Sequence, residues 1–201
     1  MHMSRNKELN EKIKEERRQQ ILSNALKLFA ANGLTATKIK DICSASGISQ
    51  GLVYHYFRSK EEIYVQLIKY AFGRMIAACR ELESLTIPPR DKIKMAIEGL
   101  IQSLKEDEDT ARYYLLVAQA TVSEAIPEEA KSIIRNANMT PYEVITRIII
   151  EGQKDGSIKS FHAEELALVF WTSISGLAIN RAVHGDKFKA PDPAILTSIF
   201  I

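Results

Sequence analysis

Residues 37–60, TKIKDICSASGISQGLVYHYFRSK, constrain the fold of this chain more than any other segment does. Apolar side chains recur at three- and four-residue spacing over residues 38–45, which predicts a short helix there. Gly47 can adopt the left-handed conformation that ends a helix without steric cost. A second short helix is expected over residues 50–57. Two short helices joined by a glycine turn predict a helix-turn-helix, whose second helix enters the major groove of DNA.

Hydroxyl side chains stand where these helices would begin. Thr37 is predicted to cap the first helix, because its hydroxyl can accept a hydrogen bond from an early backbone N–H. Ser49 can cap the second helix in the same way. Ser59 is followed by Lys60 and two glutamates, which predicts the capped, acidic start of a third helix.

The polar side chains of the second helix suit contact with DNA. Gln50 can hydrogen-bond a base edge, as amide side chains do with adenine, and Gly51 lets the backbone approach closely. Lys60 is expected to pair with a phosphate near the third helix. The predicted DNA-contacting set is Thr37, Lys38, Ser49, Gln50, Gly51, Tyr54, His55, Tyr56 and Lys60. On spacing alone, the alternative that this helix pair is only core stays open.

Residues 21–63 resemble the N-terminal domain of the tetracycline-repressor (TetR) family. The resemblance rests on A-x-x-L-F-x-x-x-G over residues 25–33, on S-G-I-S, on G-L-V-Y-H-Y-F and on S-K-E-E. Ser46 departs from the family, which more often has Ala or Gly before the turn glycine. The resemblance covers the first third of the chain. It implies a regulator that binds a palindromic double-stranded DNA operator as a homodimer and responds to a small-molecule effector.

The charges are distributed unevenly along the chain. Residues 1–60, the head, carry 11 Lys and Arg against 5 Asp and Glu, whereas residues 61–201, the body, carry 16 against 20. A basic head on a mildly acidic body fits a nucleic-acid contact confined to one end. We expect no signal peptide, because the N-terminus is polar, and no membrane span, because no apolar window is long enough.

The cysteines argue against a metal or disulfide framework. Cys43 and Cys79 fall in separate predicted helices with no metal-binding spacing. A cytoplasmic protein without a metal or another cofactor is therefore predicted.

The remaining pattern is helical, with no strand alternation. The expected fold class is all-α, with a three-helix helix-turn-helix DNA-binding domain and N-terminal arm over residues 1–60. A larger helical effector-binding and dimerisation domain is expected over residues 61–201. Residues 4–15 form either a disordered arm or the exposed start of the first helix, which is predicted to stop at Asn32 and Gly33.

An acidic run over residues 106–109 predicts a solvated junction between two helices of the body. Asp109 or Thr110 is expected to cap the helix that follows. A cation site at this junction is the alternative.

The helix expected over residues 163–184 is apolar on nearly all sides, so several neighbours must cover it. Small residues such as Gly176 would let another helix approach closely, and residues 141–154 offer a matching apolar surface. These two helices are expected to meet their copies across a two-fold axis in a homodimer. The alternative is that both belong to the core of one protomer.

The large aromatic and flexible side chains of the body are candidates for the wall of an effector site. They are Phe72, Met75, Cys79, Tyr113, Tyr114, Met139, Phe170, Trp171 and Ile174. This apolar inventory predicts a hydrophobic or aromatic effector rather than a sugar or a phosphate. The helix expected over residues 60–84 would carry the signal, because it joins the head to the body.

The histidines and motifs give no support to an enzyme. His162 and His184 lie near the two ends of one predicted helix, about 30 Å apart if it is straight. The pattern G-x-S-x-G occurs once, as G-I-S-Q-G at residues 47–51, in the predicted turn between two helices and not after a strand as a hydrolase nucleophile requires. No P-loop or H-E-x-x-H motif occurs in the sequence. We therefore predict a ligand-responsive transcriptional regulator, most simply a repressor, and not an enzyme. The alternative is a helical small-molecule-binding protein without sequence-specific DNA binding.

Overall fold

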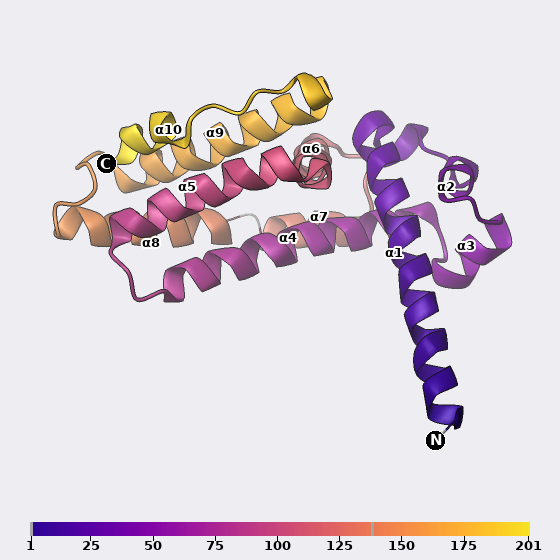
Figure 1. The fold of residues 1–201 in the computed structure, drawn as a ribbon. Coiled ribbons are helices and arrows are strands. Elements are labelled where there is room, and N and C mark those ends of the chain that lie inside the picture. Colours follow the sequence, from indigo (N-terminus) through magenta and orange to yellow (C-terminus); the bar gives the residue numbers. More distant parts are fainter. Residues whose placement is uncertain (1, 138) are drawn as a thin grey trace.

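The computed structural model describes the backbone of residues 2–137 and 139–201, and side chains at residue 9 and from residue 11 onward within these ranges. Helices make up most of this part of the chain, and no strand occurs in it. The all-α prediction is confirmed. Figure 1 shows the head on one side and an elongated body of packed helices on the other.

The head contains α1 (His2–Ala36), α2 (Ile39–Ser46) and α3 (Gln50–Tyr56). The backbone of segment 4–15 belongs to α1, and the side chains described there, at residues 9 and 11–15, are exposed, which favours the exposed start of the first helix over a disordered arm. The N-terminal half of α1 projects away from the rest of the molecule (Figure 1). The helical geometry of α1 is interrupted at Gly33, where φ is 73°, at the predicted stop.

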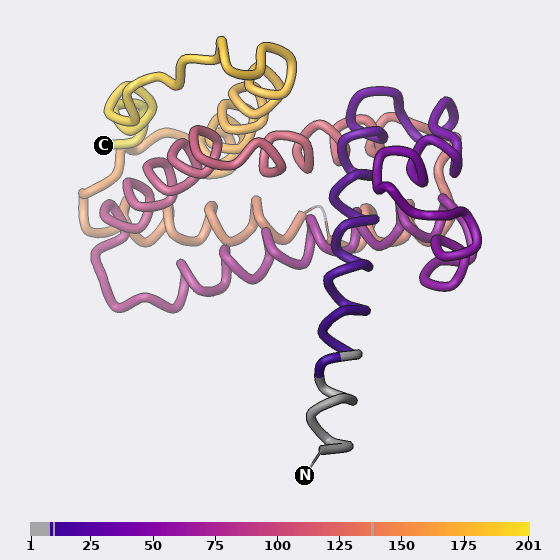
Figure 2. The backbone as a smooth tube through the Cα atoms, turned by 45° about the vertical axis from the view of Figure 1, so that its right-hand side comes forward, coloured from indigo at the N-terminus to yellow at the C-terminus, as the bar shows by residue number. Residues whose placement is uncertain are grey.

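The described residues from Lys60 onward contain seven α-helices and a short 3-10 turn. They are α4 (Lys60–Ser84), α5 (Pro89–Glu106), α6 (Glu108–Val122), α7 (Glu128–Ala137), α8 (Thr140–Lys154), α9 (Ala163–His184), η1 (Gly185–Lys187) and α10 (Pro193–Phe200). The tube in Figure 2 shows α4 running from the head along the whole body. The expected long helices over residues 60–84 and 163–184 are confirmed as α4 and α9.

Two of the predicted N-caps are confirmed by their hydrogen bonds. The side chain of Ser49 accepts from the backbone N–H of Leu52, and that of Ser59 accepts from Glu62. The cap of α6 is different from the prediction, because Asp107, rather than Asp109 or Thr110, accepts from a first-turn N–H.

The start of α2 also corrects the prediction. Lys38 is its N-cap residue, and the Lys38 backbone N–H donates to the Asp41 carboxylate at 3.0 Å. Thr37 is only 1% exposed, and its hydroxyl donates to the carbonyl of Gly33 at 2.8 Å. Thr37 therefore closes the end of α1 and does not cap α2.

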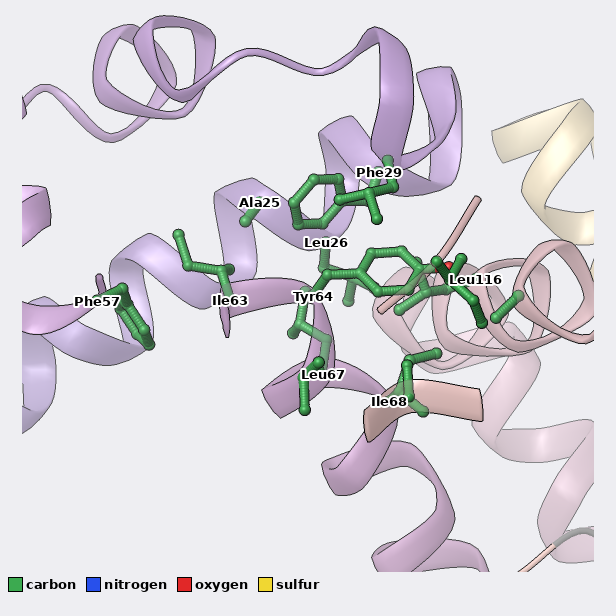
Figure 3. Close-up of a cluster of buried hydrophobic side chains, with 14 of the residues drawn as sticks. Ala25, Leu26, Phe29, Phe57, Ile63, Tyr64, Leu67, Ile68 and Leu116 are labelled. Carbon is green, nitrogen blue, oxygen red and sulfur yellow. The ribbon is translucent and has the colours of Figure 1, made fainter. Parts of the chain in front are cut away.

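Two large hydrophobic clusters hold the described residues together, and a third, smaller one consists of Leu104, Ala111 and Ala178. The first joins the head to the start of α4 and to α6 and α7, and Figure 3 shows its members Phe29, Tyr64 and Leu116. The rings of Phe29 and Tyr64 meet edge to face with centroids 5.3 Å apart. The second cluster lies inside the body, where Cys79 on α4 joins side chains of α5, α8, α9 and α10, and Tyr114 on α6 packs against it. Met75 on α4 packs against both clusters, so it lies where they meet.

The helix α9 is buried on one side and apolar on the other. Phe170 and Ile174 are fully buried, whereas Leu168 is 52% and Val183 67% exposed. Within the described residues, the stretch Ala163–Lys187 is long and apolar enough to cross a bilayer, which qualifies the expectation that no such window exists. Core helices of soluble proteins share this composition, and α9 packs against α5, α6 and α8.

Candidate nucleic-acid interface and effector site

The turn between α2 and α3 is held tightly. Gly47 ends α2 in the left-handed conformation, with φ 64° and ψ 31°. The backbone N–H of Ile48 donates to Cys43 at 3.2 Å. The Gln20 side chain on α1 donates to the Ser46 carbonyl at 2.9 Å, and this contact ties the turn to the scaffold. The helix-turn-helix is therefore presented as one unit with α1.

Two buried residues, one in α3 and one directly after it, determine which side of α3 faces the core. Val53 is 0% and Phe57 1% exposed, and the guanidinium of Arg18 lies over the Phe57 ring, 5.4 Å from its centroid. Arg18 also donates a hydrogen bond to Gln66 on α4. These contacts anchor α3 between α1 and α4 and leave its opposite side exposed.

The predicted DNA-contacting residues differ in how far their side chains are exposed. Six of them are exposed along the start of α2 and along α3, namely Lys38, Ser49, Gln50, Gly51, Tyr54 and His55. Tyr56 is half-buried, with its ring edge to face with that of His55. The structure buries Thr37 and so removes its hydroxyl from any surface that DNA could reach.

The structure corrects the role predicted for Lys60. Its ammonium donates to the carbonyls of Leu34 at 2.7 Å, Thr35 at 3.3 Å and Thr37 at 2.7 Å. An ammonium has three donors, and all three are used. Lys60 therefore joins the start of α4 to the end of α1, where a free phosphate-binding side chain was expected.

Sequence reasoning missed two exposed residues beside the exposed side chains of α3. Leu52 is 36% exposed, and Arg58 is exposed just after the helix. Leu52 and Val53 are adjacent apolar residues, and only one of them can lie on the buried side of a short helix. The positive charge of Arg58 was the available signal for a phosphate contact.

The candidate effector residues are distributed over both clusters. Phe72 and Tyr113 belong to the cluster nearer the head. Cys79, Tyr114, Phe170, Trp171 and Ile174 belong to the body cluster, and Met75 lies between the two. Met139 is 59% exposed at the start of α8, so its expected place in the wall of the interior is wrong.

The candidate effector residues are apolar or neutral side chains, although the charged residues Lys92 and Arg181 are also buried in the body. Burial, together with the smaller effect of the nearby Glu83 carboxylate, raises the pKa of the Cys79 thiol to about 11. Burial also raises the pKa of the Tyr114 phenol. Both groups therefore keep their protons at neutral pH, and the site offers neutral donors among hydrophobic side chains.

The far end of α4 is attached to the body. Arg147 on α8 donates to the Glu83 carboxylate at 2.6 Å, and this hydrogen bond lowers the pKa of Glu83. The ammonium of Lys92 on α5 donates to the Glu83 carbonyl at 2.6 Å. Because Lys60 binds the head at its other end, α4 is fixed to both parts of the molecule.

A separate cavity of about 410 Å³ opens between the start of α5 and α10. Arg90, Lys94 and Asp192 contribute to its lining, and none of the predicted effector residues does. We therefore keep the body cluster, rather than this groove, as the candidate effector site.

Residues 21–67 match the family described as bacterial regulatory proteins, tetR family. This stretch begins within α1, contains α2 and α3, and ends in α4. The N-terminal domain of this chain is a TetR-family domain. Its helix-turn-helix is thus the DNA-binding element that the resemblance implied.

Similar proteins support the TetR-family assignment. The transcriptional repressor KstR2 of Rhodococcus jostii is 28% identical over 163 residues, which cover 81% of this chain and 78% of that protein. The solved structure of the MbdR regulator from Azoarcus sp. CIB shares the fold, with a TM-score of 0.75, 22% identity, and coverage of 91% and 96%. FadR from Bacillus subtilis, solved in complex with stearoyl-CoA, has a TM-score of 0.65, 21% identity, and coverage of 90% and 95%.

Proposed function

We propose that this chain is a ligand-responsive transcriptional repressor that binds a palindromic operator as a homodimer. The observation that carries the proposal is the exposed row on α3 within a TetR-family domain. Gln50 and Tyr54 are exposed in this row, while Val53 fixes the opposite side of the helix in the core. An exposed recognition helix on a rigid scaffold can enter the major groove and hydrogen-bond base edges.

The proposed division of labour follows the two parts of the molecule. The head, residues 1–60, binds DNA, and the body, residues 61–201, binds the effector and the second copy. The relatives are named as transcriptional regulators and repressors, which supports regulation rather than catalysis. A DNA-binding regulator of this kind works in the cytoplasm.

The proposed dimer uses the exposed apolar side of α9 together with α8. Leu168, Val169 and Val183 on α9 and Ile150 on α8 are exposed, although they are large and hydrophobic. Gly176 is exposed on α9 as well, so a second helix can approach closely. A two-fold axis would pair this surface with itself and remove it from water.

The proposed effector is a hydrophobic small molecule bound between α4, α6, α8 and α9. The body cluster that these helices share offers aliphatic and aromatic side chains. A structural neighbour that binds stearoyl-CoA supports an effector with a long apolar part. Because Met75 packs against both clusters, occupation of this interior would shift α4 and with it the spacing of the two recognition helices.

The experiment is a selection of binding sites from a random duplex library, followed by fluorescence anisotropy. We expect a palindromic sequence to be enriched, with half-sites about 34 Å apart and affinity that falls steeply with salt. Stearoyl-CoA is the first effector to add, and release of the selected duplex is expected. Enrichment of no sequence, with binding of stearoyl-CoA retained, would instead support the helical ligand-binding protein without specific DNA binding.

A further inference from the structure

Among the described residues, three buried side-chain atoms have no hydrogen-bond partner: Ser46 Oγ, Trp171 Nε1 and Arg181 Nη1. The guanidinium of Arg181 is held by its other nitrogens, because Nε donates to the Leu104 carbonyl at 3.3 Å and Nη2 lies 3.7 Å from Glu108. Ser46 lies in the head, in the helix-turn-helix already described. Trp171 is different, because Nε1 is the only polar atom of its side chain.

The surroundings of Trp171 leave its N–H without an acceptor. The residue is 5% exposed and belongs to the body cluster, whose other buried members are almost all aliphatic or aromatic. The ring of Phe170 packs against it edge to face at 5.1 Å, and the ring of Tyr142 lies at 6.1 Å. Aliphatic side chains and ring faces do not replace the water that the indole N–H loses on burial.

An unpaired N–H is costly to bury, and a phenylalanine ring at this position would avoid the cost. Functional sites are where such costs are tolerated, because a ligand can supply the missing partner. The same cluster contacts the half-buried Tyr114 on the neighbouring helix α6.

We propose that Trp171 Nε1–H donates a hydrogen bond to an oxygen atom of the effector. The effector is then an apolar molecule with an uncharged acceptor, a carbonyl group of a ketone, ester or thioester, within the body cluster. An uncharged acceptor fits this position best, because the indole N–H of Trp171 carries no charge that could balance a buried carboxylate. The proposal rests on the ligand response proposed above and adds the chemistry of the ligand and the residue that selects it.

The chain contains a single tryptophan, so one indole N–H resonance reports on this site without ambiguity. We would titrate the ¹⁵N-labelled full chain with stearoyl-CoA and with S-octadecyl-CoA, which differs only in lacking the thioester carbonyl oxygen. A steroid ketone and the matching hydrocarbon form a second pair. A carbonyl probe is expected to move the indole proton downfield and to bind about tenfold more tightly than its matched analogue.

The variants separate the hydrogen bond from the shape of the site. Trp171→Phe keeps an aromatic ring and removes the N–H, so the preference for the carbonyl probe should disappear. Tyr142→Phe is the control, because it removes a hydroxyl from the neighbouring ring that packs against Trp171, and the preference should remain. Thermal melts of both variants check that the fold is kept.

Two results would overturn the assignment. One is an indole resonance that no carbonyl probe moves, and the other is an unchanged carbonyl preference in Trp171→Phe. Binding of the selected operator is measured separately on the same samples. Its failure would overturn the proposed regulatory function, and the indole measurement would still report on the ligand site.

Discussion

The ammonium of Lys60 donates a hydrogen bond to the backbone carbonyl of Thr37 at 2.7 Å. The two residues lie at the start of α4 and just before α2, so this contact closes the loop that precedes the helix-turn-helix. From the sequence, both side chains were predicted to contact DNA. In the structure they hold the head together.

The first prediction follows from this contact. Lys60→Met should lower the free energy of unfolding by about 2 kcal/mol, because carbonyls at the end of α1 lose a charged donor. It should leave the salt dependence of DNA binding almost unchanged. Lys38→Met is the matched control, since Lys38 is exposed, and it should reduce the salt slope by about one unit without lowering Tm. Equal effects of the two variants would restore Lys60 as a phosphate ligand.

The second prediction concerns Gln50, the exposed first residue of α3. Gln50→Ala should reduce discrimination at one base position of the operator by about 1–3 kcal/mol and leave binding to random DNA nearly the same. Anisotropy titrations with single-base operator variants measure this. A uniform loss across all sequences would mean that Gln50 positions the protein instead of reading a base.

The third prediction assigns a base contact to Leu52. An exposed aliphatic side chain on a recognition helix can contact the methyl group of thymine. Replacing one operator thymine by uracil, which lacks that methyl, should weaken binding of the wild type and leave Leu52→Ala unaffected. Gln50→Ala should keep its sensitivity to the same replacement. If uracil weakens binding of wild type and Leu52→Ala equally, another residue contacts the methyl.

The fourth prediction tests the proposed dimer surface. Gly176 is exposed, and no atom lies within 4 Å of a Cβ built there, so Gly176→Arg should not disturb the protomer. On an apolar helix face paired with its copy, the arginine should prevent association, and sedimentation should show monomers. Gly99→Arg on α5 is the control, because Gly99 is also exposed with no atom within 4 Å of its Cβ. Dimers that survive the first change would place the interface elsewhere.

The fifth prediction concerns transmission through α4. Met75 packs against both hydrophobic clusters, so Met75→Trp should displace α4 as an effector would. We expect operator affinity to change by about 1–3 kcal/mol, with a smaller further response to stearoyl-CoA. Met95→Trp, at an exposed position on α5, should change neither quantity. Wild-type affinity with a full response in Met75→Trp would remove Met75 from the sensing path.

The sequence alone determined the local features of the head. Gly47 at the turn and the serine caps of α3 and α4 were predicted correctly, because each depends on hydrogen bonds within a few residues. The long helices α4 and α9 were predictable for a related reason, since apolar periodicity and capping act along one segment of chain.

The tertiary structure decided which of these side chains remain available for function. The contact between Lys60 and Thr37 spans 23 positions, and no local pattern encodes it. The exposure of Leu52 beside buried Val53 depends on where α1 and α4 pack against α3. The unpaired N–H of Trp171 depends on the neighbours that surround it in the body. Helix starts and turns follow from local chain geometry, whereas burial and hydrogen-bond partners follow from residues that only folding brings together.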